Sequence, residues 1–160
     1  VCGKASIDSV ETTAACESFE YSDEKISASV FTELPKALRD KQNIFEHTGG
    51  LHAVAIFDST GKLLMMREDV GRHNAMDKLI GAIAASKTEL PNNCITLLSG
   101  RASFELIQKG IMTKMPIICA IGAPSSLAVE LAQNFNMSLI GFLKQNKFNI
   151  YSGKERIADV

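Results

Sequence analysis

The stretch CITLLSGRASFELIQKGIMTKMPIICAIGAPSSLAVELAQNFNMSLIGF, residues 94–142, decides the fold class. Apolar runs at 94–98, 117–121 and 138–142 predict buried strands, and amphipathic segments at 103–112 and 126–134 predict the helices between them. Strands that alternate with helices pair in parallel, because each connection has to cross over the sheet. This part of the chain therefore predicts a parallel α/β sheet.

The preceding residues add an antiparallel beginning. Residues 51–57 and 62–66 are apolar runs on either side of an Asp-Ser-Thr-Gly turn at 58–61, which predicts a hairpin. Helical periodicity occurs at 27–42 and 74–85, where Asn74 and Asp77 resemble a capping pair, and a last strand is predicted at 148–151. We expect an α/β fold of three layers (α/β/α) with a mixed sheet, in one domain over residues 1–160.

Composition and charge restrict the class of function. The chain has 160 residues, 46% hydrophobic and 22% charged, which is typical of a globular domain. No apolar run approaches the roughly 20 residues of a membrane helix, and the net charge of −1 comes without a dense Lys/Arg stripe. Four scattered cysteines do not make a disulfide framework. We expect a cytoplasmic protein that binds neither membranes nor nucleic acid.

The polar segments that precede the predicted hairpin or follow a predicted strand are the first candidates for a site, because open α/β sheets bind ligands at the carboxyl ends of strands. Their glycines allow close backbone approach, and helix starts favour phosphate. Turns and caps use the same residue types without a ligand, so both interpretations stay open. No P-loop or Gly-x-Gly-x-x-Gly fingerprint is present. The candidates are Thr48, Gly49, Gly50, His52, Asp69, Gly71, Arg72, Ser99, Gly100, Arg101, Ser103, Ser125 and Ser126.

Three further residues are candidates for chemistry. His73 stands at a predicted helix start, where it can act as acid, base or hydrogen-bond donor, or serve only as a cap. Cys2 lies outside the predicted strands, and Lys4 would favour its thiolate, although an inert cysteine remains the alternative. No Cys-x-x-Cys or His-x-x-x-His is present, so we expect no metal held by the protein itself.

Five motifs follow one another along the chain. They are Cys-Gly-Lys at 2–4, Thr-Gly-Gly-Leu-His at 48–52, Glu-Asp-Val-Gly-Arg-His-Asn at 68–74 with Asp-Lys at 77–78, Ser-Gly-Arg-Ala-Ser-Phe at 99–104, and Ala-Pro-Ser-Ser-Leu-Ala at 123–128. Together they resemble the formate dehydrogenase accessory sulfurtransferases, the FdhD/NarQ family, over the whole chain. The resemblance implies a cytidine deaminase-like form of the fold and a homodimer.

The resemblance also implies a function. Such proteins carry sulfur from a cysteine desulfurase, as a cysteine persulfide, to the molybdenum or tungsten form of the bis(molybdopterin guanine dinucleotide) cofactor of formate dehydrogenase. It makes Cys2, Lys4 and His73 catalytic and the junction residues cofactor-binding. It adds a terminal turn that would pack against guanine and neutralise phosphate, although an exposed charged turn is the alternative. That turn comprises Phe142, Leu143, Lys144, Gln145, Asn146 and Lys147.

The sulfur loop of the family reads Cys-x-x-Cys-Gly-Lys, and residues 2–4 match its second half. Its first cysteine would stand two residues before Val1, so we expect a piece of a longer protein whose N-terminal region is missing. Two other functions stay open: a cofactor-binding chaperone without catalysis, and a relative of nucleoside deaminases without zinc. A sulfur-transfer assay distinguishes the chaperone from a sulfur carrier, and metal analysis tests the relation to deaminases.

Overall fold

The computed structural model describes residues 18–20, 24–41, 50–87 and 89–160. These residues form a six-stranded sheet with the order β3-β2-β4-β5-β6-β7. Its strands are β2 (His52–Phe57), β3 (Leu63–Asp69), β4 (Ile95–Leu98), β5 (Ile117–Ala120), β6 (Ser138–Lys144) and β7 (Lys147–Ser152). Strands β4, β5 and β6 are parallel, whereas β2 is antiparallel to β3 and β4, and β7 to β6. The predicted mixed sheet with an antiparallel first hairpin is confirmed.

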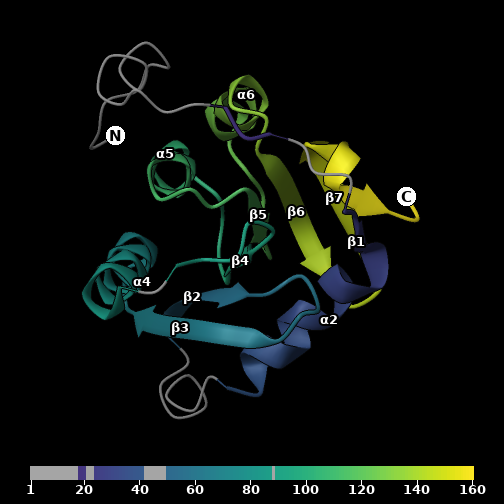
Figure 1. Ribbon diagram of the computed structural model, residues 1–160. Coiled ribbons are helices and arrows are strands. Elements are labelled where there is room, and N and C mark those ends of the chain that lie inside the picture. Colours follow the sequence, from purple (N-terminus) through teal and green to yellow (C-terminus); the bar gives the residue numbers. More distant parts are fainter. Residues whose placement is uncertain (1–17, 21–23, 42–49, 88) are drawn as a thin grey trace.

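Helices cover both faces of this sheet. The α-helices of the described residues are α2 (Ala28–Arg39), α4 (Arg72–Ser86), α5 (Phe104–Met112) and α6 (Ser126–Asn134). Figure 1 shows α4, α5 and α6 along one side of the sheet and α2 along the other. The predicted three-layer arrangement is therefore confirmed, while its cytidine deaminase-like form stays a prediction.

Two hydrophobic cores hold the sheet, one on each face. Along β2, Val54 and Ile56 pack into the core under α4, α5 and α6, while Ala55 and Phe57 pack against α2. This alternation is the two-residue period of a strand. All residues of β4 and β5 are buried, as expected for parallel strands covered on both sides. The strand ends are thus fixed by packing on both faces.

The start of α4 differs from the sequence prediction. The helix begins two residues earlier than predicted, with Gly71 as its N-cap and no side-chain capping bond. The Asn74 amide donates to Asp69 (3.1 Å), and Asp77 forms an ion pair with Lys109 of α5 (2.6 Å). The predicted capping pair was wrong, because both side chains bond to neighbouring elements instead of their own helix.

A small second sheet was not predicted. Strands β1 (Ile26–Ser27) and β8 (Ile157–Ala158) pair in parallel, and β8 follows the 3₁₀ helix η1 (Lys154–Arg156). Elements of two or three residues are too short to show a hydrophobic period. This sheet brings the C-terminal residues against the segment that leads into α2.

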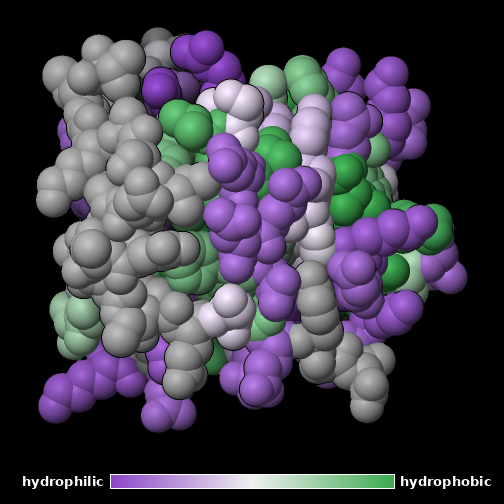
Figure 2. Space-filling model, turned by 90° about the horizontal axis from the view of Figure 1, so that it is seen from above, coloured by the Kyte–Doolittle hydropathy of each residue, from purple (hydrophilic) through white to green (hydrophobic). Residues whose placement is uncertain are grey.

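One face of the molecule, above α6, is largely polar. Figure 2 shows the face above α6, where hydrophilic residues make up most of the described centre and hydrophobic residues lie between and beside them. None of the helices in the described part of the chain has the length and hydropathy that a membrane span requires.

Candidate functional site

The topology collects the predicted site residues that are described along one edge of the sheet. Strands β3, β4, β5 and β6 end there, and the antiparallel strands β2 and β7 begin there; we name it the carboxyl edge. Backbone hydrogen bonds continue across it beyond the strands, from Gly122 N to Gly100 O and from Phe142 N to Gly122 O, both 3.0 Å. Cys2, Lys4, Thr48 and Gly49 lie outside the described residues, and Gly50 lies two residues before the start of β2.

The turn between β3 and α4 is held by Asp69. Its carboxylate accepts hydrogen bonds from the Gly71 N–H (3.0 Å) and from Asn74, and pairs with Lys78 at 2.5 Å. These contacts, Lys78 first, lower the pKa of Asp69 to about 2. The structure therefore gives Asp69 a role in fixing the turn that presents the first residues of α4.

The first turn of α4 holds a guanidinium group and no acidic residue of its own. Arg72 and His73 occupy its first two positions, no acidic residue lies in that turn, and Gly71 provides no side-chain cap. The Nε of Arg72 is buried and has no hydrogen-bond partner among the described residues. Unpaired helix N–H groups, the helix dipole and a guanidinium together favour an anion at this position.

The segment after β4 is packed closely against β2. The Ser99 hydroxyl accepts a hydrogen bond from the Ala53 N–H at 2.8 Å, so part of its bonding capacity serves the fold. A Cβ on Gly100 would stand 3.1 Å from Nδ1 of His52. Glycine at this position thus lets the His52 ring lie against the backbone of the loop.

Arg101 extends from the same segment and is exposed. A Cβ on Gly122 would lie 2.9 Å from Cγ of Arg101, so the side chain of Arg101 passes directly over that glycine. Among the described residues, Arg101 forms no ion pair. A planar guanidinium in this state can form a bidentate contact with a phosphate.

His73 connects the starts of α4 and α5. Its Nε2 lies 3.2 Å from Oγ of Ser103, the N-cap residue of α5, and 3.7 Å from Oε2 of Glu105. The starts of these two helices are therefore neighbours. Glu105 was not predicted, and an acid in the first turn of α5 was its only sequence signal.

Ser125 and Ser126 open α6 at the same edge. Ser125 is the N-cap, and its hydroxyl accepts from the Ala128 N–H at 3.2 Å. A hydroxyl that caps a helix stabilises it by about 1 kcal/mol without any ligand. Ser126 is exposed as the first residue of the helix. Capping alone therefore accounts for Ser125, in agreement with the alternative that such residues serve turns and caps without a ligand.

The end of β6, just before the turn to β7, has one unusual backbone position. Phe142 has a φ of 51°, a value uncommon for non-glycine residues, and is 43% exposed. Leu143 is buried in the core against α2, so its side chain is not available for the contact that was predicted. The remaining predicted residues, Lys144, Gln145, Asn146 and Lys147, are exposed.

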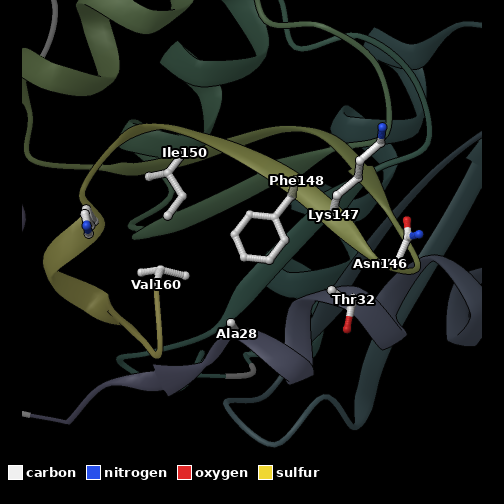
Figure 3. A pocket seen from close by; sticks show the side chains of 8 residues that line it. Ala28, Thr32, Asn146, Lys147, Phe148, Ile150 and Val160 are labelled. Atoms are coloured by element: carbon white, nitrogen blue, oxygen red, sulfur yellow. The ribbon is translucent and has the colours of Figure 1, made fainter.

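A cavity of about 530 Å³ lies beside this turn, between β7 and α2. It is lined by Ala28, Thr32, Asn146, Lys147, Phe148, Ile150, Lys154 and Val160. In Figure 3 the Phe148 ring occupies the middle of this lining, with Lys147 and Asn146 at one end and Ile150 and Val160 at the other. Two of the predicted cofactor-binding residues thus belong to a cavity with both apolar and cationic walls.

The described cysteines are not suited to carrying sulfur. Cys94 and Cys119 are free and buried. Burial raises the pKa of the Cys94 thiol to about 11 and raises that of Cys119 further, so both are protonated at neutral pH. The described residues contain no group of three His, Cys, Asp or Glu side chains that could hold a metal ion.

Comparison with known proteins gives the family. A model of the FdhD/NarQ family matches residues 1–158. The chain belongs to the FdhD/NarQ family. It is 46% identical over 159 residues to a protein of Streptomyces coelicolor named sulfur carrier protein FdhD, covering 99% of this chain and 56% of that protein. A protein of the same name from Sulfurisphaera tokodaii is 48% identical over 133 residues, covering 83% of this chain and 52% of that protein.

A solved structure shares the fold. It is described as a formate dehydrogenase accessory protein from Desulfotalea psychrophila, and it matches with a TM-score of 0.79 at 25% identity, covering 95% of this chain and 62% of that one. The chain thus spans little more than half the length of the curated FdhD relatives given above.

Proposed function

We propose that this chain is part of a sulfur carrier for the maturation of formate dehydrogenase. Its carboxyl edge binds the acceptor as cargo: the molybdenum or tungsten bis(molybdopterin guanine dinucleotide) cofactor. Support comes from membership in the FdhD/NarQ family and from the names of relatives. The observation that carries the proposal is the gathering of Arg72, His73 and Arg101 at adjoining helix starts of one edge.

The chemistry of that edge suits a diphosphate. Arg101 and Arg72 supply guanidinium groups, and the first turn of α4 supplies N–H groups. A dinucleotide cofactor carries several phosphate charges, and guanidinium groups bind phosphate oxygens in pairs. The exposed Phe142 and the cavity beside Lys147 offer apolar and cationic surface for the rest of the ligand.

The sulfur would travel on the cysteine loop that includes Cys2. The buried Cys94 and Cys119 are protonated at neutral pH and closed to solvent, which disfavours persulfide formation on either. A cysteine desulfurase would place a sulfane sulfur on a loop thiolate, and transfer of that sulfur to the bound acceptor would regenerate the thiolate.

Calorimetry tests the binding half of this proposal. We expect GDP to bind the chain more tightly than ADP, because the proposed cargo contains guanine, and the two nucleotides share the diphosphate but differ in the hydrogen-bonding groups of the base. Equal affinities would contradict recognition of guanine, and the absence of binding would contradict the cofactor site.

Labelled sulfur tests the carrier half against a cofactor-binding chaperone. A desulfurase with ³⁵S-cysteine is incubated with a chain that carries the complete cysteine loop, with variants in which alanine replaces Cys2, the first cysteine of the loop, or both, and with Cys94→Ala. We expect label that a reducing agent releases, and much less of it when both loop cysteines are replaced, with Cys94→Ala as the control. Cofactor binding without label in any of these proteins would favour the chaperone.

A further inference from the structure

A carboxylate outside the sequence motifs lies beside His73. Nε2 of His73 lies 3.2 Å from the Ser103 hydroxyl and 3.7 Å from Oε2 of Glu105. A carboxylate only accepts hydrogen bonds, so the ring nitrogen that faces it carries a proton, and the Ser103 hydroxyl can accept from that nitrogen. The proton of the neutral His73 ring therefore resides on Nε2.

The other ring nitrogen is the one left for a ligand. Nδ1 of His73 has no hydrogen-bond partner among the described residues. In a neutral ring with its proton on Nε2, Nδ1 carries a lone pair and cannot donate to an anion. His73 can thus donate to a phosphate oxygen through Nδ1 only after that nitrogen has gained a proton.

Several charged groups belong to the elements that pack around His73. They are Arg72, Asp77 and Lys78 on α4, His52 on β2, Arg67, Glu68 and Asp69 on β3, Arg101 before α5, and Glu105 and Lys109 on α5. Asp69 is paired with Lys78, and Asp77 with Lys109. Glu105 forms its ion pair with His73 alone among the described residues.

The Glu105 carboxylate is ionised at neutral pH. Its pKa is lowered chiefly by its own backbone N–H at the start of α5, with smaller contributions from Ser103 and His73, while burial opposes the shift. It therefore supplies the negative charge that would balance an imidazolium. No other carboxylate of the described residues lies within ion-pair distance of this ring.

We propose that Glu105 is a positioning residue, which fixes the His73 proton on Nε2 and balances the charge of the ring when Nδ1 gains a second proton to bind a phosphate oxygen. The proposal rests on the phosphate site proposed above. One proton passes from solvent to Nδ1 as the anion binds, and no other bond changes. Anion binding at the carboxyl edge is then proton-coupled, and it weakens as the pH rises.

Calorimetry in buffers of different ionisation enthalpy counts the protons. For GDP binding at a pH of about 8, where an ordinary histidine is neutral, we expect uptake approaching one proton in the wild type and none in His73→Gln. Glu105→Gln should take up fewer protons and bind GDP about twofold to fivefold more weakly, the scale of a partly exposed charge pair. Glu130→Gln, which removes an exposed acid of α6, is the control and should match the wild type.

A spectrum of the free protein separates this proposal from the phosphate site. The ¹⁵N shifts of the His73 ring should show a proton on Nε2, with a smaller share of that tautomer in Glu105→Gln. A proton on Nδ1, or GDP binding without proton uptake, overturns the role of Glu105. If GDP does not bind, the phosphate site fails, and an unchanged tautomer in Glu105→Gln would overturn the positioning role as well.

Discussion

One arginine lies at one end of the sheet and two lie at the other, and they differ in how their guanidinium groups are hydrogen-bonded. Arg156 is only 2% exposed, and its guanidinium donates to the carbonyls of Asn136 (2.6 Å) and Glu20 (2.9 Å) and to the Ser138 hydroxyl (3.2 Å). At the carboxyl edge, Arg101 is exposed and forms no ion pair with the described residues, and Nε of Arg72 is buried without a partner among them.

This difference separates a structural arginine from arginines available to a ligand. Buried polar groups are almost always paired in a folded protein, because an unpaired one costs about 1–3 kcal/mol. The fold meets that requirement at Arg156 with backbone oxygens. At Arg72 the buried Nε has no hydrogen-bond partner among the described residues, and it lies at a helix start that favours anions.

The largest effect is expected from Arg156→Leu. The substitution leaves the part-buried carbonyls of Asn136 and Glu20 and the buried Ser138 hydroxyl without their donor, which should lower the free energy of unfolding by about 3 kcal/mol. Urea unfolding measures this, with Lys154→Ala, an exposed neighbour, as a control that should change stability by less than about 0.5 kcal/mol. If Arg156→Leu is as stable as the wild type, Arg156 is not a structural arginine, and the contrast with the arginines of the carboxyl edge fails.

The next effect is expected from Arg101→Ala. Loss of a charged hydrogen-bond donor should weaken GDP binding by about 1.5–3 kcal/mol, while unfolding is unchanged because the side chain is exposed. Lys36→Ala on α2 removes a charge from the opposite face and is the control.

Arg101→Lys sharpens that result. It keeps the charge but loses the planar fork, so a bidentate contact predicts binding nearly as poor as in Arg101→Ala. Native affinity in Arg101→Lys would show that charge alone matters there. If Arg101→Ala instead unfolds the chain and leaves the affinity of the folded fraction intact, Arg101 is structural like Arg156.

The smallest effect is expected from Asp69→Asn. Its contacts in the folded protein lower the pKa of Asp69 from the ordinary 3.8 to about 2, so the ionised Asp69 stabilises the turn above about pH 4 and loses that effect as the pH falls toward 2. Asp69→Asn should be less stable than wild type at neutral pH, and the two should converge in acid. A stability difference that stays constant from neutral to acid pH would show that ionisation of Asp69 does not matter; Glu33→Gln on α2 is the control.

The sequence predicted most of the fold because its periodicities are strong. The helix Ser126–Asn134 has the predicted bounds, and Ile117–Ala120 is a fully buried strand as expected. The burial of Arg156 was not predictable, because a charged residue near the end of a chain has no local pattern that indicates a core. Leu143 was assigned to the ligand although it packs against α2. Its burial follows from the irregular pairing after Gly141, which local sequence does not reveal.

The candidate site was predictable in its composition but not in its contacts. Strand-to-helix junctions of parallel strands meet at one edge, so the neighbourhood of His73 and Ser103 followed from topology. The contact of His73 with Glu105 joins two helices, and no pattern within either helix encodes it. Asp69 was assigned to the cofactor because the sequence does not show that Lys78 already pairs with it.

Hydrogen exchange with and without GDP tests most directly whether the carboxyl edge is the ligand site. Bound nucleotide should slow exchange in residues 71–73 and 99–103, at the starts of α4 and α5. It should leave residues 153–157, around Arg156, unchanged. Protection confined to 153–157, or no protection at the carboxyl edge at saturating GDP, would contradict the account.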